Sequence, residues 1–596
     1  ELFDIQQIEV LKGPQGALYG RNAIGGAILV TTKMPGDEFE AKLKTGIENG
    51  PGYSLQGVMG GPLAEGIKYR LSASVVDHDG LLENTYLKEE ADPYKDVALR
   101  GRLVWDGSEA FKGDLRFSYA KLQTQALYFN IVGDANDVSL PIRVNNRGDN
   151  DRTLLTGSAK FDWQIGGGTL TSVTAFDTTR EILTGDAFNF LPIDESLFKL
   201  IFGFDMNQSQ YLNVKYRSQE LRFTSDASGP LRWIAGAYAV ETDRYISTGN
   251  MVDTGAGVFP VYRKPSTNPL NPQATFLADS QDNFAWALFA DVVYQFSDSL
   301  EGNVAMRYDN DKRRNTTETP TAFLPNVPGF TQGFTGQVRE NTWSELQPKF
   351  TLRYKASDNT SLYGGWSRGF RSGGFNQTGV GGVAAANGIR GVNDLFDAEV
   401  ADTAEVGLKG RYLDGRLSVN AALFNTDAEG SYFFVFLAAN STQNLGNLSK
   451  VRYQGGEIDL AFRATDHLDL FAGFAVTDSE IRESAAASQV GNQAPLVSRN
   501  TVNLGAQYSQ PVAEGDFTAR VDWRRTGRTW WEPDNTTSRD PVSLLDARLS
   551  YDTGVWSATL WGKNLTDERY NAEFSPGGFV FKAKPRRYGF ELGYKF

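Results

Sequence analysis

The sequence predicts an all-β protein: a transmembrane barrel of 22 antiparallel strands that encloses the remnant of a separate N-terminal domain. Three observations predict this fold. Apolar and polar residues alternate along most of the chain, short turns alternate with longer connections, and residues 1–35 follow a different pattern. Alternation is expected because successive side chains of a membrane-spanning strand face lipid and lumen in turn.

Composition excludes several other classes of protein. The chain has 596 residues, with 59 Lys and Arg against 72 Asp and Glu, so its formal net charge is −13, and it has no Cys and 2 His. Without Cys there is no disulfide scaffold, iron–sulfur cluster or Cys-based zinc site, and two His leave little for a His-based metal centre. The acidic balance argues against a nucleic-acid partner. We therefore expect no enzyme, metal site or cofactor.

The chain also lacks an apolar run long enough for a helical membrane span. Its apolar runs reach about eight residues, as at 233–240 and 432–439, whereas a membrane helix needs about 20. Two readings remain: a large soluble all-β protein, and a membrane barrel whose strands alternate instead of running apolar.

Alternating segments recur in pairs around short polar turns. Every second residue is apolar along 286–296, a turn follows at 297–299, and the alternation resumes along 300–308. The same unit surrounds the turns at 413–416 and 464–467. Short Asp, Gly, Asn and Ser turns between alternating segments are typical of β-hairpins.

The number of strands follows from the connections between them. Ten tight turns lie near 61–66, 106–110, 165–168, 225–230, 297–299, 356–359, 413–416, 464–467, 510–515 and 552–554. Eleven connections, most of them long, lie near 49–52, 78–94, 124–151, 181–212, 240–283, 311–341, 371–400, 426–452, 477–500, 525–542 and 571–585. Twenty-one connections join 22 strands, an even number typical of plugged outer-membrane transporters rather than porins. A soluble β-sandwich gives no reason for short turns at one end of the strands and long loops at the other.

The last strand carries the sharpest alternation. Tyr588, Phe590, Leu592, Tyr594 and Phe596 alternate with charged residues and glycines, so one side suits lipid and the other a wet lumen. The alternative is that this last segment forms the edge strand of an ordinary antiparallel sheet. A terminal aromatic residue after such a strand resembles the signal read by outer-membrane assembly machinery, which makes Phe596 the candidate assembly signal.

Residues 1–35 do not continue the barrel pattern. A short strand at 8–11 meets a Gly-Pro turn, and a glycine-rich stretch leads to a second strand at 27–32. Repeated glycine permits close approach of backbones. Such a piece cannot form a core by itself, so we expect it to pack inside another structure.

Several motifs carry a resemblance to a known family. Residues 10–26 (VLKGPQGALYGRNAIGG) resemble the end of the plug domain of TonB-dependent outer-membrane receptors. Further motifs that resemble this family lie at 362–376, 405–410, 453–459, 564–570 and 585–596. The resemblance implies that 1–35 is the C-terminal part of a plug domain, with the signal peptide, TonB box and first part of the plug missing before it, and that 36–596 is the transmembrane barrel with long extracellular loops.

The same resemblance implies contacts between plug and barrel. In the family, basic plug residues face two barrel glutamates, which by motif are Glu405 and Glu457. The plug partner is Lys12, where Arg is commoner, with Arg21 as a second candidate. A charge in a narrow wet lumen is better paired than alone. The alternative is that both glutamates face only lumen water.

Ligand selection is expected in the long loops and the lumen wall, where aromatic faces with a few cations suit a chelate or an aromatic acid. The candidate residues are Arg368, Arg371, Tyr432, Phe433, Phe434, Trp530 and Trp531. The alternative is that they pack in loops or in an aromatic girdle. A second basic group, Arg70, Arg100, Arg102 and Arg116, either attracts anions or pairs with the surplus acidic residues.

The resemblance implies TonB-dependent import of a scarce nutrient across the outer membrane of a Gram-negative cell, by a monomer in contact with outer-membrane lipid. An iron chelate such as a ferric siderophore is the expected substrate; cobalamin, oligosaccharides and aromatic compounds are alternatives on the same scaffold. Energy would come from the inner-membrane TonB complex. A different class, a passive porin or a structural barrel, also remains, although a porin would not carry residues 1–35 as a plug.

Overall fold

The computed structural model describes residues 3–227, 229–330, 333–437, 439–440 and 442–596. The predicted turn near 225–230 includes residue 228, and the predicted N-terminal segment begins with residues 1–2, so these three positions lie outside the described residues. No described helix is long and apolar enough to cross a membrane.

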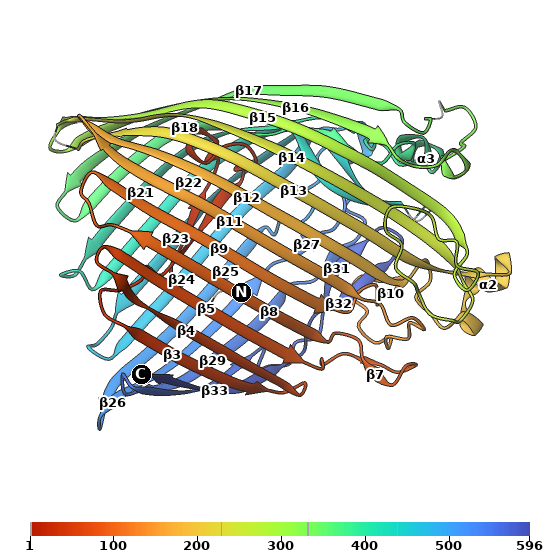
Figure 1. The fold of residues 1–596 in the computed structure, drawn as a ribbon, viewed down its shortest axis with the longest axis horizontal. Coiled ribbons are helices and arrows are strands. Elements are labelled where there is room, and N and C mark those ends of the chain that lie inside the picture. The colour runs from red at the N-terminus through yellow and green to blue at the C-terminus, as the bar shows by residue number, and fades with distance from the viewer. Residues whose placement is uncertain (1–2, 228, 331–332, 438, 441) are drawn as a thin grey trace.

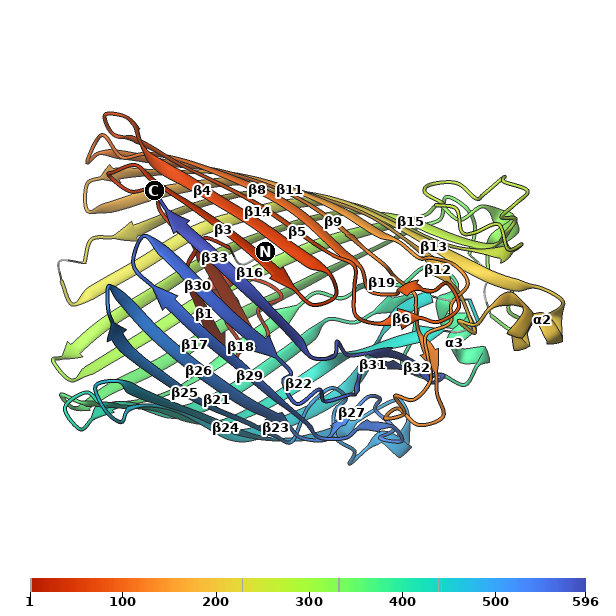
Figure 2. The same cartoon turned by 90° about the horizontal axis from the view of Figure 1, so that it is seen from below.

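Within the described residues, 22 antiparallel strands close into a barrel, which confirms the predicted fold class. Figure 1 shows these strands running obliquely around the barrel, with helices and irregular connections gathered at one end. Figure 2 shows the first and last barrel strands side by side. They pair from Lys42 opposite Lys595 to Glu48 opposite Gly589, so the two ends of the sheet meet and the described barrel has no open edge.

The first half of the barrel consists of β3 (Glu40–Glu48), β4 (Gly52–Ala64), β5 (Ile67–His78), β8 (Tyr94–Trp105), β9 (Phe111–Thr124), β11 (Asn150–Ile165), β12 (Gly168–Asp186), β13 (Asp205–Ser225), β14 (Leu231–Asp253), β15 (Gln273–Ser297) and β16 (Leu300–Thr317). The second half consists of β17 (Val338–Ser357), β18 (Thr360–Arg371), β21 (Glu399–Tyr412), β22 (Leu417–Leu437), β23 (Thr442–Arg463), β24 (Leu468–Glu483), β25 (Asn500–Val512), β26 (Gly515–Thr526), β29 (Val542–Asp552), β30 (Trp556–Lys563) and β33 (Arg587–Lys595).

The connections carry short elements of their own. Small sheets are formed by β6 (Glu83–Asn84) with β7 (Glu89–Glu90), β19 (Gly374–Phe375) with β20 (Leu395–Phe396), β27 (Thr529–Trp530) with β28 (Ser538–Arg539), and β32 (Phe579–Lys582) with β10 (Asn130–Ile131) and β31 (Asn571–Ser575). Helical turns are α2 (Leu197–Phe202), α3 (Val380–Ala386) and three 3-10 turns at Ile193–Glu195, Thr321–Phe323 and Ala487–Gln489.

The predicted turns join consecutive barrel strands at one end, and the predicted longer connections join them at the other. The strands nevertheless extend further than predicted at the long-loop end. Most of the connection predicted near 426–452 is strand, because β22 reaches Leu437 and β23 begins at Thr442, and the connection predicted near 240–283 spans 254–272. Beyond the lipid both faces of a strand meet water or protein, so a strand can continue there without alternating.

A band of outward-facing apolar residues shows where the barrel meets lipid. On β15, Phe284, Leu288 and Phe296 are 53%, 56% and 60% exposed, while Ala287 and Asp291 on the opposite face are buried. A tilted strand of this length is sufficient to cross the hydrocarbon core. The last strand follows the same rule, since Tyr588, Leu592 and Phe596 are exposed on its outer face.

The N-terminal segment (residues 3–35) forms a hairpin within the barrel. β1 (Ile5–Lys12) and β2 (Gly26–Thr32) pair antiparallel, and a single helical turn, α1 (Gly16–Tyr19), lies in their connection. Figure 2 shows β1 inside the ring of strands. α1 packs against β15, β16, β17 and β18, which places the tip of the hairpin against one side of the lumen wall.

The long connections pack on one another through an apolar core and buried carboxylates. Leu127, Val144, Phe190 and Phe579, from three different connections, are buried together. Beside them, Asp186 accepts hydrogen bonds from the backbone N–H groups of Asn145 and Asn146 at 3.0 and 3.1 Å. Burial raises the pKa of Asp186 to about 8, and the neighbouring Asp253 adds to the shift, whereas these hydrogen bonds oppose it.

Lipid exposure predicts the effect of a charge on the outer face. Leu288→Arg places a guanidinium at the middle of the apolar band, and we expect it to lower the free energy of unfolding in lipid by about 2–4 kcal/mol. Phe296→Arg, at the rim of the same strand, is the matched control and should cost about 0–1 kcal/mol. Equal losses in urea titrations of the two variants in vesicles would contradict this placement of the membrane.

The raised pKa of Asp186 predicts a pH dependence of loop packing. Because the folded protein binds this proton more tightly than the unfolded chain, the docked loop loses stability as the pH rises from about 4 to about 8. We therefore expect residues 125–149 to be better protected from hydrogen exchange at pH 5 than at pH 9, after correction for intrinsic rates. Asp186→Asn should remove most of that difference; an unchanged difference would point to another group.

Candidate functional site

Ion pairs hold the N-terminal segment to the lumen wall at several places. At its start, the Asp4 carboxylate accepts hydrogen bonds from Arg70 of β5, at 2.6 Å from Nε and 2.5 Å from Nη2. Arg70 also pairs with Glu40 of β3, and the Asp4 and Arg70 side chains are only 7% and 3% exposed. Asp4 was not among the predicted contacts, although a bidentate, buried pair of this kind is the stronger type of anchor.

Lys12 lies beside β23. Its Nζ is 2.8 Å from Glu457 Oε1 and 3.3 Å from Asp459 Oδ2, and the Lys12 side chain is half exposed. Glu405 lines the same cavity of about 410 Å³ as Lys12 and Glu457, but among the described residues it forms no ion pair with Lys12. Glu405 stands on β21 and Glu457 on β23, so β22 separates them by two strand spacings, roughly 10 Å.

Arg21 contacts a different carboxylate from the two glutamates named by motif. Its guanidinium pairs with Asp311 of β16, whose side chain is fully buried. Arg313, two residues further along the same strand, donates to the same Asp311 oxygen at 2.8 Å. Asp311 therefore pairs with one guanidinium of the N-terminal segment and with one of the barrel.

The tip of the hairpin lies close against the wall. A Cβ atom on Gly16 would lie 1.8 Å from Oε1 of Gln347 on β17, so a larger residue would have to displace this buried side chain. The Gln15 side chain accepts a hydrogen bond from Lys349 at 3.0 Å, and the Asn22 backbone N–H donates to the Phe370 carbonyl at 2.9 Å. The connection from 13 to 25 is thus positioned on the wall formed by β16, β17 and β18.

A cavity of about 510 Å³, here called the loop-side cavity, lies between this tip and the long connections. It is lined by Arg21, Asn22, Gln210, Thr242, Arg244, Ile246, Thr248, Gln281, Asn283, Arg313, Gly374, Phe375, Asn376, Gln377, Phe396, Phe434, Gln443, Asn444 and Leu445. Arginines, side-chain amides and three phenylalanines thus surround one space, a combination that can hold an organic ligand with charged and hydrogen-bonding groups.

Most of the predicted ligand-binding residues have other contacts. Arg368 pairs with Asp402 at 2.8 Å and Glu345 at 3.1 Å. Arg371 pairs with Glu399 and lies 4.0 Å from the Tyr432 ring centre, and the Tyr432 hydroxyl donates to the Ser372 carbonyl at 2.7 Å. These side chains therefore form contacts within the barrel wall and with the connection that follows β18.

The remaining four candidates divide between the cavity and the loops. Phe434 lines the loop-side cavity, whereas Phe433 packs against the apolar cores of two connections. Trp530 belongs to β27, and the Trp531 ring lies 6.1 Å from that of Phe574. The sequence analysis did not select Arg244, which shares one face of β14 with Thr242, Ile246 and Thr248, because it predicted a connection for this segment.

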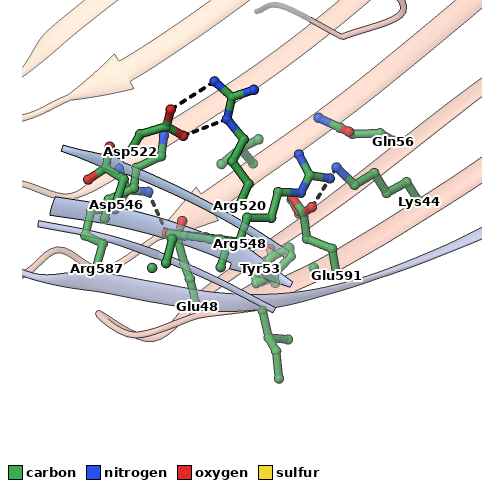
Figure 3. A pocket seen from close by; sticks show the side chains of 18 residues that line it. Lys44, Glu48, Tyr53, Gln56, Arg520, Asp522, Asp546, Arg548, Arg587 and Glu591 are labelled. Atoms are coloured by element: carbon green, nitrogen blue, oxygen red, sulfur yellow. Dashed lines mark hydrogen bonds and ion pairs between the residues drawn. The ribbon is translucent and has the colours of Figure 1, made fainter. Parts of the chain in front are cut away.

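Elsewhere the lumen wall is lined by paired charges. A cavity of about 590 Å³ lies along the seam of the first and last strands (Figure 3). There Arg520 pairs with Asp522 at 2.7 Å and Lys44 with Glu591 at 2.9 Å, and Arg587 reaches Glu48. Of the second basic group, Arg70, Arg102 and Arg116 pair with carboxylates, so pairing explains these arginines without a ligand.

These features define a class of protein: a transmembrane barrel of 22 strands with an N-terminal segment held inside it and a polar cavity between that segment and the surface loops. The family model "TonB dependent receptor-like, beta-barrel" matches residues 92–565, and "TonB-dependent Receptor Plug Domain" matches residues 1–27. The chain belongs to the TonB-dependent receptors, which are receptors and transporters of the outer membrane of Gram-negative bacteria.

Relatives with known roles cover most of the chain. The pesticin receptor of Yersinia pestis is 22% identical over 96% of this chain and 77% of its own length, and the catecholate siderophore receptor Fiu of Escherichia coli is 21% identical over 99% and 80%. The ferric yersiniabactin uptake receptor FyuA from Yersinia pestis has a TM-score of 0.79 at 16% identity, covering 100% of this chain and 85% of that one. At that identity the structural likeness shows the fold alone.

The anchors of the N-terminal segment should differ in strength. Asp4→Asn leaves the buried Arg70 with Glu40 alone, and we expect it to lower the free energy of local opening by about 1.5–3 kcal/mol, the contribution of a hydrogen bond to a charged group. Lys12→Gln removes a half-exposed pair and should cost about 0–1 kcal/mol. Hydrogen exchange of β1 in detergent measures both, and a larger effect of Lys12→Gln would reverse this ranking.

Proposed function

We propose that this protein imports an iron chelate, such as a ferric siderophore, across the outer membrane with energy from the inner-membrane TonB complex. The observation that carries the proposal is the position of the loop-side cavity, whose floor includes Arg21 and Asn22 of the N-terminal segment. A ligand in this cavity would contact both the barrel wall and the N-terminal segment.

In this proposal residues 1–35 act as the end of the plug and residues 36–596 as the barrel. The contacts of Lys12 with Glu457 and of Arg21 with Asp311 hold the plug in place. Binding alone cannot drive uphill import, because a ligand supplies only its differential affinity for two states. An external energy source is therefore required, and membership of the TonB-dependent receptor family favours TonB as that source.

The printed names of relatives support an iron chelate as the substrate. They include a ferric yersiniabactin uptake receptor, a catecholate siderophore receptor and a siderophore receptor from Acinetobacter baumannii. Cobalamin, oligosaccharides and aromatic compounds remain the alternatives within the same transport class. A passive porin is a weaker candidate, because the N-terminal segment lies inside the lumen and is tied to the wall by buried ion pairs.

Uptake of radioactive iron tests the proposal. The gene is expressed in a Gram-negative host that lacks its own siderophore receptors, with and without TonB, and a panel of ferric chelates is supplied under iron limitation. We expect at least one chelate to be taken up only when both the receptor and TonB are present. Uptake that does not require TonB would favour a passive channel, and the absence of uptake for every ferric chelate would overturn the assignment of iron.

A substitution in the cavity tests where the chelate binds. Asn283→Ala removes one amide from the cavity wall, and a lost hydrogen bond of about 1 kcal/mol corresponds to a roughly fivefold rise in the dissociation constant of the transported chelate. Lys355→Ala, whose partner is Asp358 at an exposed turn, is the control and should leave binding unchanged. Unaltered binding by Asn283→Ala would argue against this cavity.

A further inference from the structure

The charge of the loop-side cavity is opposite to that of the whole protein. The chain has a formal net charge of −13, yet the residues that line this cavity include three arginines, Arg21, Arg244 and Arg313, and no aspartate or glutamate among those the structure describes. An accumulation of positive charge in a concave, partly dehydrated space attracts anions.

Only part of this positive charge is compensated by the wall. Arg21 and Arg313 share the single carboxylate of Asp311, and both donate to the same oxygen, Oδ2. Two guanidinium groups thus share one carboxylate, and this cluster of three side chains has a net charge of one positive unit. Both guanidinium groups retain further N–H donors, because each carries five.

Arg244 is a further guanidinium of this cavity that has no ion-pair partner within the described residues. It stands opposite Val214 on β13 and Gln281 on β15, neither of which is acidic. Within the described part of the chain it forms no ion pair or hydrogen bond, and its electrostatic neighbours are Asp279 and Arg313. Asp279 is itself buried, its Oδ1 accepts hydrogen bonds from Asn315 and Thr378, and within the described residues it forms no ion pair with Arg244.

Removing an arginine partly from water costs free energy when its N–H groups have no hydrogen-bond acceptor. A ligand that supplies an acceptor offsets this cost. Carboxylate and phosphate groups match the planar guanidinium with two parallel hydrogen bonds. The side-chain amides around Arg244, among them Gln210, Gln281 and Asn283, offer donors and acceptors for the neutral polar groups of the same ligand.

From this arrangement we infer that the loop-side cavity selects a ligand with at least two anionic groups, one bound by Arg244 and one by Arg21 and Arg313. Arg244 is the specificity-determining residue, because it has no partner in the wall to release. The inference rests on the proposed function for the presence of a chelate in this cavity, and it narrows the substrate class to polyanionic chelates rather than neutral ones.

Binding to the purified full chain in detergent tests the inference. The probes are ferric citrate, citrate without iron and inorganic pyrophosphate as polyanions, and a neutral ferric trihydroxamate as the uncharged comparison. We expect the wild-type protein to bind at least one polyanion more tightly than the neutral chelate, and this preference to weaken as the salt concentration rises.

Two substitutions separate charge from folding. Arg244→Gln should weaken polyanion binding about 10- to 100-fold, the loss expected for a charged hydrogen-bond pair, with little effect on the neutral chelate. Arg244→Lys keeps the charge without the fork and should recover part of the affinity. Arg353→Gln, which removes an exposed partner of Glu301 far from the cavity, is the matched control and should bind like the wild type.

The outcomes distinguish this inference from the proposed function. If no polyanion binds, if Arg244→Gln binds polyanions like the wild type, or if the neutral chelate binds best, the inference is overturned, even where TonB-dependent uptake of a neutral ferric chelate supports the proposed function. If polyanions bind in an Arg244-dependent way but no ferric chelate is imported, the charge selectivity stands and the import of iron does not.

Discussion

The structure depends on one constraint: in lipid, every backbone N–H and C=O group must find its hydrogen-bond partner within the protein. The pairing of β3 with β33 meets this constraint for the last open edges of the sheet. Closure of the barrel has two consequences for its side chains. Side chains must alternate between lipid and lumen, and the inner face, which meets water, can carry the charged groups that hold a separate segment.

Many charged side chains of the lumen wall pair either with one another or with the N-terminal segment. Asp4, Lys12 and Arg21 each meet an oppositely charged group of the barrel, and similar pairs line the seam in Figure 3. Arg244 differs from these residues, because within the described part of the chain it forms no ion pair and it faces a cavity.

The sequence was sufficient for the architecture because its signals are local. Alternation and turn composition act over a few residues, and they predicted the strand number and the closed all-β fold. These signals did not predict the strand ends that lie beyond the lipid, where alternation is no longer imposed. The long-loop ends of β22 and β23 are an example. The site was less predictable: the pairs Asp4–Arg70 and Arg21–Asp311 join residues 66 and 290 positions apart, so they depend on the register of many strands together.

The seam also has a consequence for how the molecule is made. Tyr588 of the last strand donates its backbone N–H to Asn49, which lies 539 positions earlier in the chain. A contact between sites so distant along the polymer forms only after nearly all of the protein has been synthesised and delivered. Closure of the ring between β3 and β33 therefore requires the last residues of the chain as well as the first barrel strand.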